Sequence, residues 1–108
     1  MTWTKKIKHT RPNTGVEFYR VESDSYSYMS DSDSSHVEST YRDTEKLASA
    51  SVSLSENELE LTKTFVFDDE DSWNEFWNDS RIQAWISARN TYHTSNSITV
   101  EILQDEAT

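Results

Sequence analysis

The beginning of the chain alternates between two kinds of side chain with the two-residue period of a half-buried strand. Over residues 2–9, Trp3 and Ile7 fall on one face with Lys5 between them, while threonines and lysines fall on the other. The run at 11–15 then supplies turn-forming residues, including the only proline and the only glycine of the chain. We therefore predict a first strand over residues 2–9.

A β-hairpin is the clearest local pattern. Segment 48–54 alternates alanine, valine and leucine with serine, and segment 59–67 alternates leucine and phenylalanine with mostly polar residues. Residues 55–58, Ser-Glu-Asn-Glu, supply the turn between these strands. Lys63 interrupts the apolar row of the second strand, so we expect its amine to reach water or to pair with an acid.

The acidic cluster Asp-Asp-Glu-Asp directly follows the hairpin and favours the beginning of a helix. Carboxylates there bond to the free N–H groups of the first turn and complement the helix dipole. We predict one long helix over about 69–93. Its apolar stripes around Trp73 and Trp85 point to different sides, so we expect a kink, or a break capped by Asp79 or Ser80.

The remaining segments are more polar. Residues 23–35 are rich in serine and aspartate, which predicts a loop. A short helix is predicted at about 34–46, where Ser35 and Glu38 have the spacing of a capping box. Residues 104–108 read as a polar tail.

A last strand is predicted over 98–102, where apolar residues again alternate with polar ones. The resulting order of strand, helix, strand, strand, helix, strand predicts an α+β domain over residues 1–103 of the ferredoxin-like βαββαβ type. Such a domain has a four-stranded antiparallel sheet with its helices on one face. The other face is then either polar, as its serines and threonines would make it, or covered by another subunit.

Composition excludes several classes of function. The chain has 108 residues, with 20 acidic and 10 basic side chains and a formal charge of −10. We expect no direct binding of nucleic acid, because that binding depends on lysine and arginine neutralising phosphates. Cysteine is absent, which excludes disulfides and thiolate chemistry, and a single glycine excludes the glycine-rich phosphate loops.

The sequence also predicts a protein without a resident cofactor or metal. The three histidines lack ligand spacing, and a nucleophile elbow needs two glycines. We therefore expect no catalytic, cofactor-binding or metal-binding residues and no enzymatic activity. With neither a signal peptide nor a membrane span in the sequence, we expect a location in a virion or in the host cytoplasm and no membrane partner.

Part of the chain resembles the dimeric α+β barrel proteins, which include the antibiotic-biosynthesis monooxygenase-like domains. The resemblance covers about 47–103 and includes the hairpin, the runs 64–68 and 72–76, and the run 88–92 before the last strand. It implies a dimer whose sheets close face to face, and in some members oxidation of a substrate without metal or flavin. It also implies a pocket whose candidate lining residues are Phe65, Trp73, Trp77, Trp85 and Tyr92, with Asn90 or His93 as polar groups.

A second resemblance concerns the run 3–13, Trp-Thr-Lys-Lys-Ile-Lys-His-Thr-Arg-Pro-Asn, together with the richness of the chain in Ser, Thr, Asp and Asn. These features are similar to small uncharacterised proteins of tailed bacteriophages. The resemblance implies a viral structural protein.

The basic residues are concentrated in the first 20 positions, whereas the rest of the chain is strongly acidic. We therefore predict a non-enzymatic assembly or interaction protein that forms a homo-oligomer or binds an acidic partner surface through its sheet and its N-terminal strand. The residues expected to contact the partner are Trp3, Lys5, Lys6 and Lys8.

Two other functions stay open at this point. The acidic chain could be an inhibitor that mimics nucleic acid and occupies the basic groove of a host enzyme. Alternatively, it could be a cofactor-independent monooxygenase-like enzyme. That activity would require a buried aromatic pocket of at least ~300 Å³ opening beside Asn90 or His93.

Overall fold

A computed structural model describes residues 1–19 and 35–108 of the chain. The predicted serine and aspartate loop at 23–35 therefore lies, apart from Ser35, outside the described residues. The strands are β1 (Trp3–Thr10), β2 (Leu47–Leu54), β3 (Glu60–Phe67) and β4 (Thr99–Ala107). The helices are the short π-helix η1 (Glu38–Arg42), α2 (Glu70–Trp77) and α3 (Ser80–Asn96).

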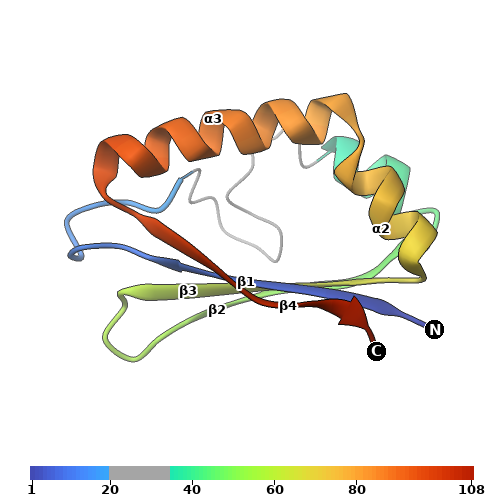
Figure 1. Ribbon diagram of the computed structural model, residues 1–108, viewed down its shortest axis with the longest axis horizontal. Helices are drawn as coiled ribbons and strands as arrows, with labels where there is room; N and C mark the ends of the chain where they lie inside the picture. The colour runs from blue at the N-terminus through green and yellow to red at the C-terminus, as the bar shows by residue number, and fades with distance from the viewer. Residues whose placement is uncertain (20–34) are drawn as a thin grey trace.

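The four strands form one antiparallel sheet in the order β2-β3-β1-β4, and α2 and α3 lie on the same face of it (Figure 1). The predicted α+β class is confirmed, and the sheet and its helices are compatible with a ferredoxin-like fold. Because β1 is an inner strand, the basic N-terminal segment is part of the sheet. None of the described helices is long and apolar enough to cross a membrane.

The predicted polar tail at 104–108 is wrong for most of its length, because β4 continues to Ala107. Lys6 pairs with Gln104 and Ile7 with Ile102, so one extra residue bulges out of β4. The strand extends because β1 offers free main-chain partners there, and polar side chains are tolerated at an exposed edge. The two termini meet where the N–H of Thr108 donates to the carbonyl of Thr2 at 2.8 Å.

The hairpin of β2 and β3 is confirmed, with one change in its apolar row. Leu47 is buried, while Ala48 is exposed and the register shifts between Leu47 and Ser49. This irregularity puts Leu47 on the same face as Ala50, opposite Phe67 and Phe65 of β3. The larger leucine thus enters the core in place of the alanine that simple alternation predicts.

Two capped helices replace the single helix predicted over 69–93, with the expected break at Asp79. Asp69 caps α2 by accepting a hydrogen bond from the N–H of Ser72 at 2.7 Å, and Asp79 caps α3 by accepting one from the N–H of Arg81 at 2.9 Å. The second helix ends three residues later than predicted, at Asn96, because the left-handed backbone conformation that stops it lies at the next residue.

The short helix is smaller than the predicted range 34–46. Helical residues run from 35 to 42, and η1 has no side-chain hydrogen bond at its N-terminal cap, Val37. A left-handed residue, Glu45 with φ of 64°, reverses the chain before β2 begins. The segment still contributes two fully buried side chains, Val37 and Tyr41, to the core.

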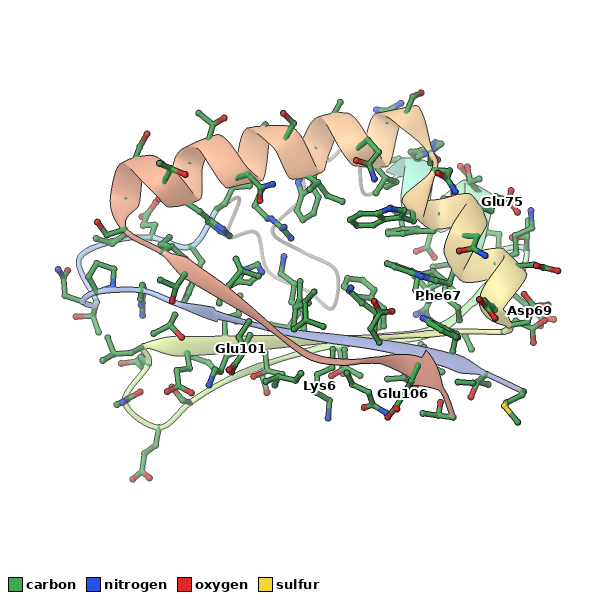
Figure 2. All side chains as sticks on the ribbon, in the orientation of Figure 1. Lys6, Phe67, Asp69, Glu75, Glu101 and Glu106 are labelled. Atoms are coloured by element: carbon green, nitrogen blue, oxygen red, sulfur yellow. The ribbon has the colours of Figure 1, made fainter. Side chains whose placement is uncertain are left out.

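The core between the sheet and the helices is aromatic. Phe67 points from β3 toward α2 (Figure 2), and its ring lies 5.4 Å from that of Trp73 and 5.2 Å from that of Phe76. Such rings each remove a large apolar area from water, which compensates for the low apolar content of the chain. The buried residues of this cluster are Val37, Tyr41, Leu47, Phe65, Phe67, Phe76, Ile82 and Trp85.

The opposite face of the sheet is polar, which is the first of the two alternatives predicted for it. Lys6 and Glu106 project from this face, away from the helices (Figure 2). Lys8 pairs there with Glu60 at 3.7 Å and with Glu101 at 3.3 Å. Serines of β2 and threonines of β3 occupy most of the remaining positions.

Candidate binding site

The structure divides the four residues predicted to contact a partner between the two faces of the sheet. Trp3 and Lys5 lie on the helix side, where the indole N–H of Trp3 and the amine of Lys5 each donate to Asp105 at 3.0 Å. Lys6 and Lys8 lie on the polar face. The four residues therefore do not form one continuous surface, and their contact with a partner stays a prediction.

A cavity of about 130 Å³ lies between the sheet and the helices α2 and α3. Aromatic and aliphatic side chains form most of its wall, and three cations complete it. The lining residues are Lys5, Ile7, Lys63, Phe65, Trp73, Phe76, Trp77, Trp85, Ile86, Arg89, Val100 and Ile102. In the part of the chain that the structure describes, no acidic residue lines the cavity.

Lys5 covers one end of this cavity. Its amine lies 5.1 Å from the ring centroid of Trp73 and 5.8 Å from that of Trp77, so the charge rests on two aromatic faces. The two indole rings lie 5.5 Å apart, one helical turn from each other on α2. Lys5 is also bound to Asp105, which neutralises its charge at this end.

Lys63 is buried inside the molecule, which contradicts the first of the two alternatives predicted for its amine, contact with water. Only 3% of the residue is exposed, and its amine lies 4.8 Å from the ring centroid of Trp85. The guanidinium of Arg89 lies over the same indole, at 5.6 Å. Burial and the nearby Arg89 charge lower the pKa of Lys63 to about 7.

Two histidines lie beside these cations. His9 and His93 are 1% and 4% exposed, and their ring centroids are 4.8 Å apart. Burial, followed by the charges of Lys63 and Arg89, lowers the pKa of His9 to about 2; burial, followed by the charges of Arg89 and Lys63, lowers that of His93 to about 4. Both imidazoles are therefore neutral near pH 7.

The sequence pattern did not predict this cluster of buried basic side chains. His93 is buried because α3 turns this side chain toward the sheet. One usable signal exists for His9: it follows Trp3, Lys5 and Ile7 at two-residue spacing and so belongs to the row that faces the helices. A residue as distant in sequence as Arg89 offers no such signal.

Several nitrogens of this cluster lack a hydrogen-bond partner among the residues that the structure describes. They are Nε2 of His9, Nε1 of Trp85, Nε of Arg89, and both ring nitrogens of His93. Buried donors without acceptors are uncommon, because each one loses its hydrogen bonds to water. Together with the neighbouring cations, the N–H groups of Trp85 and Arg89 could hold a negatively charged group.

The cavity differs from the pocket implied by the monooxygenase-like resemblance. At about 130 Å³ it is smaller than the required volume, and neither Asn90 nor His93 lines it. Asn90 is exposed, and Tyr92 instead donates a hydrogen bond to the carbonyl of Glu17. Within residues 1–19 and 35–108, no group of three or more His, Asp or Glu side chains is placed to hold a metal.

The resemblances to the dimeric α+β barrel proteins and to tailed-bacteriophage proteins stay predictions. Comparisons of the chain with protein-family models, with curated proteins and with solved structures found no match.

Proposed function

We propose that the protein is a non-enzymatic assembly module that pairs with a second copy of itself through the β2 edge of its sheet. The supporting observation is the composition of this strand. Leu47–Leu54 is an edge strand of eight residues without a charged side chain or a proline, in a chain with a net charge of −10. Natural monomers usually protect an edge of this length with charges or proline, because its free N–H and C=O groups pair readily.

A second copy fits this edge well. If a two-fold axis passes through Ser51, antiparallel pairing places Ser49 opposite the second copy's Ser53 and Ala50 opposite its Val52. Serines then meet serines on the polar face, and apolar residues meet on the face that carries the helices, as the alternation of β2 requires. The two sheets would join into one sheet of twice the width.

The other edge of the sheet is less suited to self-pairing. Strand β4 carries Glu101, Asp105 and Glu106, and two copies of it would bring like charges close together. Two earlier predictions are independent of this interface. They are the contact of the basic N-terminal strand with a partner and the viral origin of the protein. Pairing through the uncharged strand β2 would form the predicted homo-oligomer.

Light scattering coupled to size-exclusion chromatography tests the proposal. The wild-type protein should elute as a dimer at micromolar concentration. The substitution Ser51→Lys places two lysines opposite each other at the axis and should yield the monomer. Thr64→Lys is the matched control, because Thr64 pairs with Ser51 on the same face of the inner strand β3.

Either of two outcomes would contradict the proposed interface. One is a wild-type protein that stays monomeric throughout the micromolar range. The other is a dimer that Ser51→Lys leaves intact, in which case a different surface holds the two copies together.

A further inference from the structure

The cavity beside α3 has the charge pattern of an anion site within an acidic protein. Lys5, Lys63 and Arg89 line it, and no carboxylate of residues 1–19 or 35–108 does, although the chain has twice as many acidic as basic residues. Acids of the neighbouring strands either face the other side of the sheet, as Glu101 does, or bind Lys5 at the far end, as Asp105 does.

We propose that this cavity binds a small carboxylate attached to one apolar ring, of the size of benzoate. The carboxylate lies between Arg89 and Lys63, and the ring lies against the indoles of α2 and α3. The proposal concerns ligand binding alone.

The head of the site contains two N–H donors without a partner among the described residues. A guanidinium presents several N–H groups in one plane and matches the two oxygens of a carboxylate, and Nε of Arg89 has no acceptor among the described residues. The indole N–H of Trp85, a residue only 8% exposed, also lacks an acceptor within the described chain. A bound carboxylate would satisfy both donors.

The volume limits the body of the ligand. An apolar cavity of about 150 Å³ accommodates one benzene molecule. The cavity here, at about 130 Å³ and partly bounded by exposed residues, therefore holds a single ring and excludes nucleotides and long acyl chains. Its walls of Trp73, Trp77 and Phe76 favour a flat aromatic or cyclic body.

Access to the cavity comes from the side of β4. Trp77, Val100 and Ile102 line it and are 42%, 41% and 60% exposed. No residue of β2 contributes to the wall. The ligand site is therefore separate from the proposed dimer edge, and each can fail without the other.

Nuclear magnetic resonance of the indole N–H groups tests the site directly. The chain has four tryptophans, of which Trp73, Trp77 and Trp85 line the cavity. Titration with benzoate should shift their indole resonances, with a dissociation constant between about 1 μM and 1 mM. Trp3, whose indole N–H is bonded to Asp105 outside the cavity, serves as the internal control. The neutral analogue benzamide should bind at least ~10-fold more weakly, because it lacks the charge.

Substitutions of Arg89 and Lys63 test whether these side chains bind the carboxylate of the ligand. Arg89→Gln and Lys63→Met should each weaken benzoate binding at least ~10-fold while the dispersed amide spectrum of the folded protein is retained. The matched controls are Arg81→Gln, an exposed arginine of the same helix, and Lys6→Met on the polar face; neither should change the affinity.

Three results would overturn the proposal. These are the absence of any shift of the cavity tryptophans at ~10 mM benzoate, well above the expected range of affinity; equal binding of benzamide and benzoate; and unchanged affinity in folded Arg89→Gln. The first two use the wild-type protein and do not depend on whether a variant folds.

Discussion

His9 of β1 and His93 of α3 meet edge to face, with ring centroids 4.8 Å apart, although 84 residues separate them in the chain. Their contact joins an inner strand to the last turns of the long helix. It also lies beside Lys63 and Arg89, so four basic side chains occupy one buried region of an acidic protein.

The two histidines should make the protein less stable in acid. Their folded-state pKa values, about 2 for His9 and about 4 for His93, lie below the ordinary value of 6.5. As the pH falls below 6.5, the unfolded chain therefore takes up protons first, and the free energy of unfolding decreases down to about pH 4 for His93. Each histidine can contribute up to ~1.4 kcal/mol per pH unit.

Urea denaturation at several pH values between about 7 and 5 measures this slope. His93→Gln should reduce it, since glutamine does not titrate. An equal slope in the wild type and the variant would show that His93 is not buried in its neutral form.

Lys63 should titrate near neutral pH. Its pKa is lowered to about 7 by burial and by Arg89, so its side-chain carbon resonances should move with a midpoint close to pH 7. In the unfolded state the Lys63 amine keeps its proton up to about pH 10.5. The contribution of this residue to the free energy of unfolding should therefore rise between about pH 7 and pH 10.5. Lys63→Met identifies the resonance, because it should vanish in that variant; a midpoint near 10.5 would contradict the buried site.

Asp79 should contribute more to stability than an ordinary helix cap. Its Oδ1 caps α3, and its Oδ2 accepts hydrogen bonds from Tyr41 at 2.7 Å and from His36 at 2.6 Å, which ties α3 to the short helix. Loss of the cap costs ~1 kcal/mol, and each bond to a charged group adds ~1.5 to 3 kcal/mol. Asp79→Ala should therefore destabilise the fold by at least ~2 kcal/mol.

Asp69→Ala is the matched control for that variant, because Asp69 caps α2 through the N–H of Ser72. Its cost should stay near ~1 kcal/mol. Equal effects in thermal denaturation would mean that the bonds of Asp79 to Tyr41 and His36 contribute nothing.

Acid should weaken the contribution of Asp79. Desolvation alone would raise its pKa, but hydrogen bonds from His36, Tyr41 and the N–H of Arg81 outweigh that effect and lower the pKa to about 2. Its stabilising effect is therefore present above about pH 3.8 and is lost as the pH falls through 2. The difference in stability between wild type and Asp79→Ala should shrink over this range; a constant difference would contradict the lowered pKa.

Phe67 should be a main contributor to the aromatic core. It is fully buried between Trp73 and Phe76, so Phe67→Ala should cost ~3 to 5 kcal/mol, through lost burial and the cavity left behind. Val66→Ala, on the polar face of the same strand, should cost much less. Similar losses of stability for the two variants in urea denaturation would contradict the assignment of the faces.

Local chemistry determined much of the fold. The two-residue period of the strands and the carboxylates before each long helix depend on neighbouring residues, so the hairpin, the class of the fold and the break at Asp79 could be predicted from the sequence. The residues at which these strands and helices begin and end were less predictable. The burial of Leu47 in place of Ala48 depends on an irregularity in pairing, and the extension of β4 to Ala107 depends on free positions along β1.

The candidate site could not be predicted from local sequence patterns, because it too depends on pairing and packing between distant segments. Lys63 appeared in the sequence as an exception in an apolar row, whereas tertiary structure decided that Arg89, His9 and His93 surround it and that the helices leave a cavity beside it. The sequence by itself determined which side chains of β1 and β3 face the helices, because that follows from the two-residue period of these regular strands. Which of those side chains meet across the interior, and how their charges and volumes combine, depends on contacts between distant segments, and only the folded chain decides these.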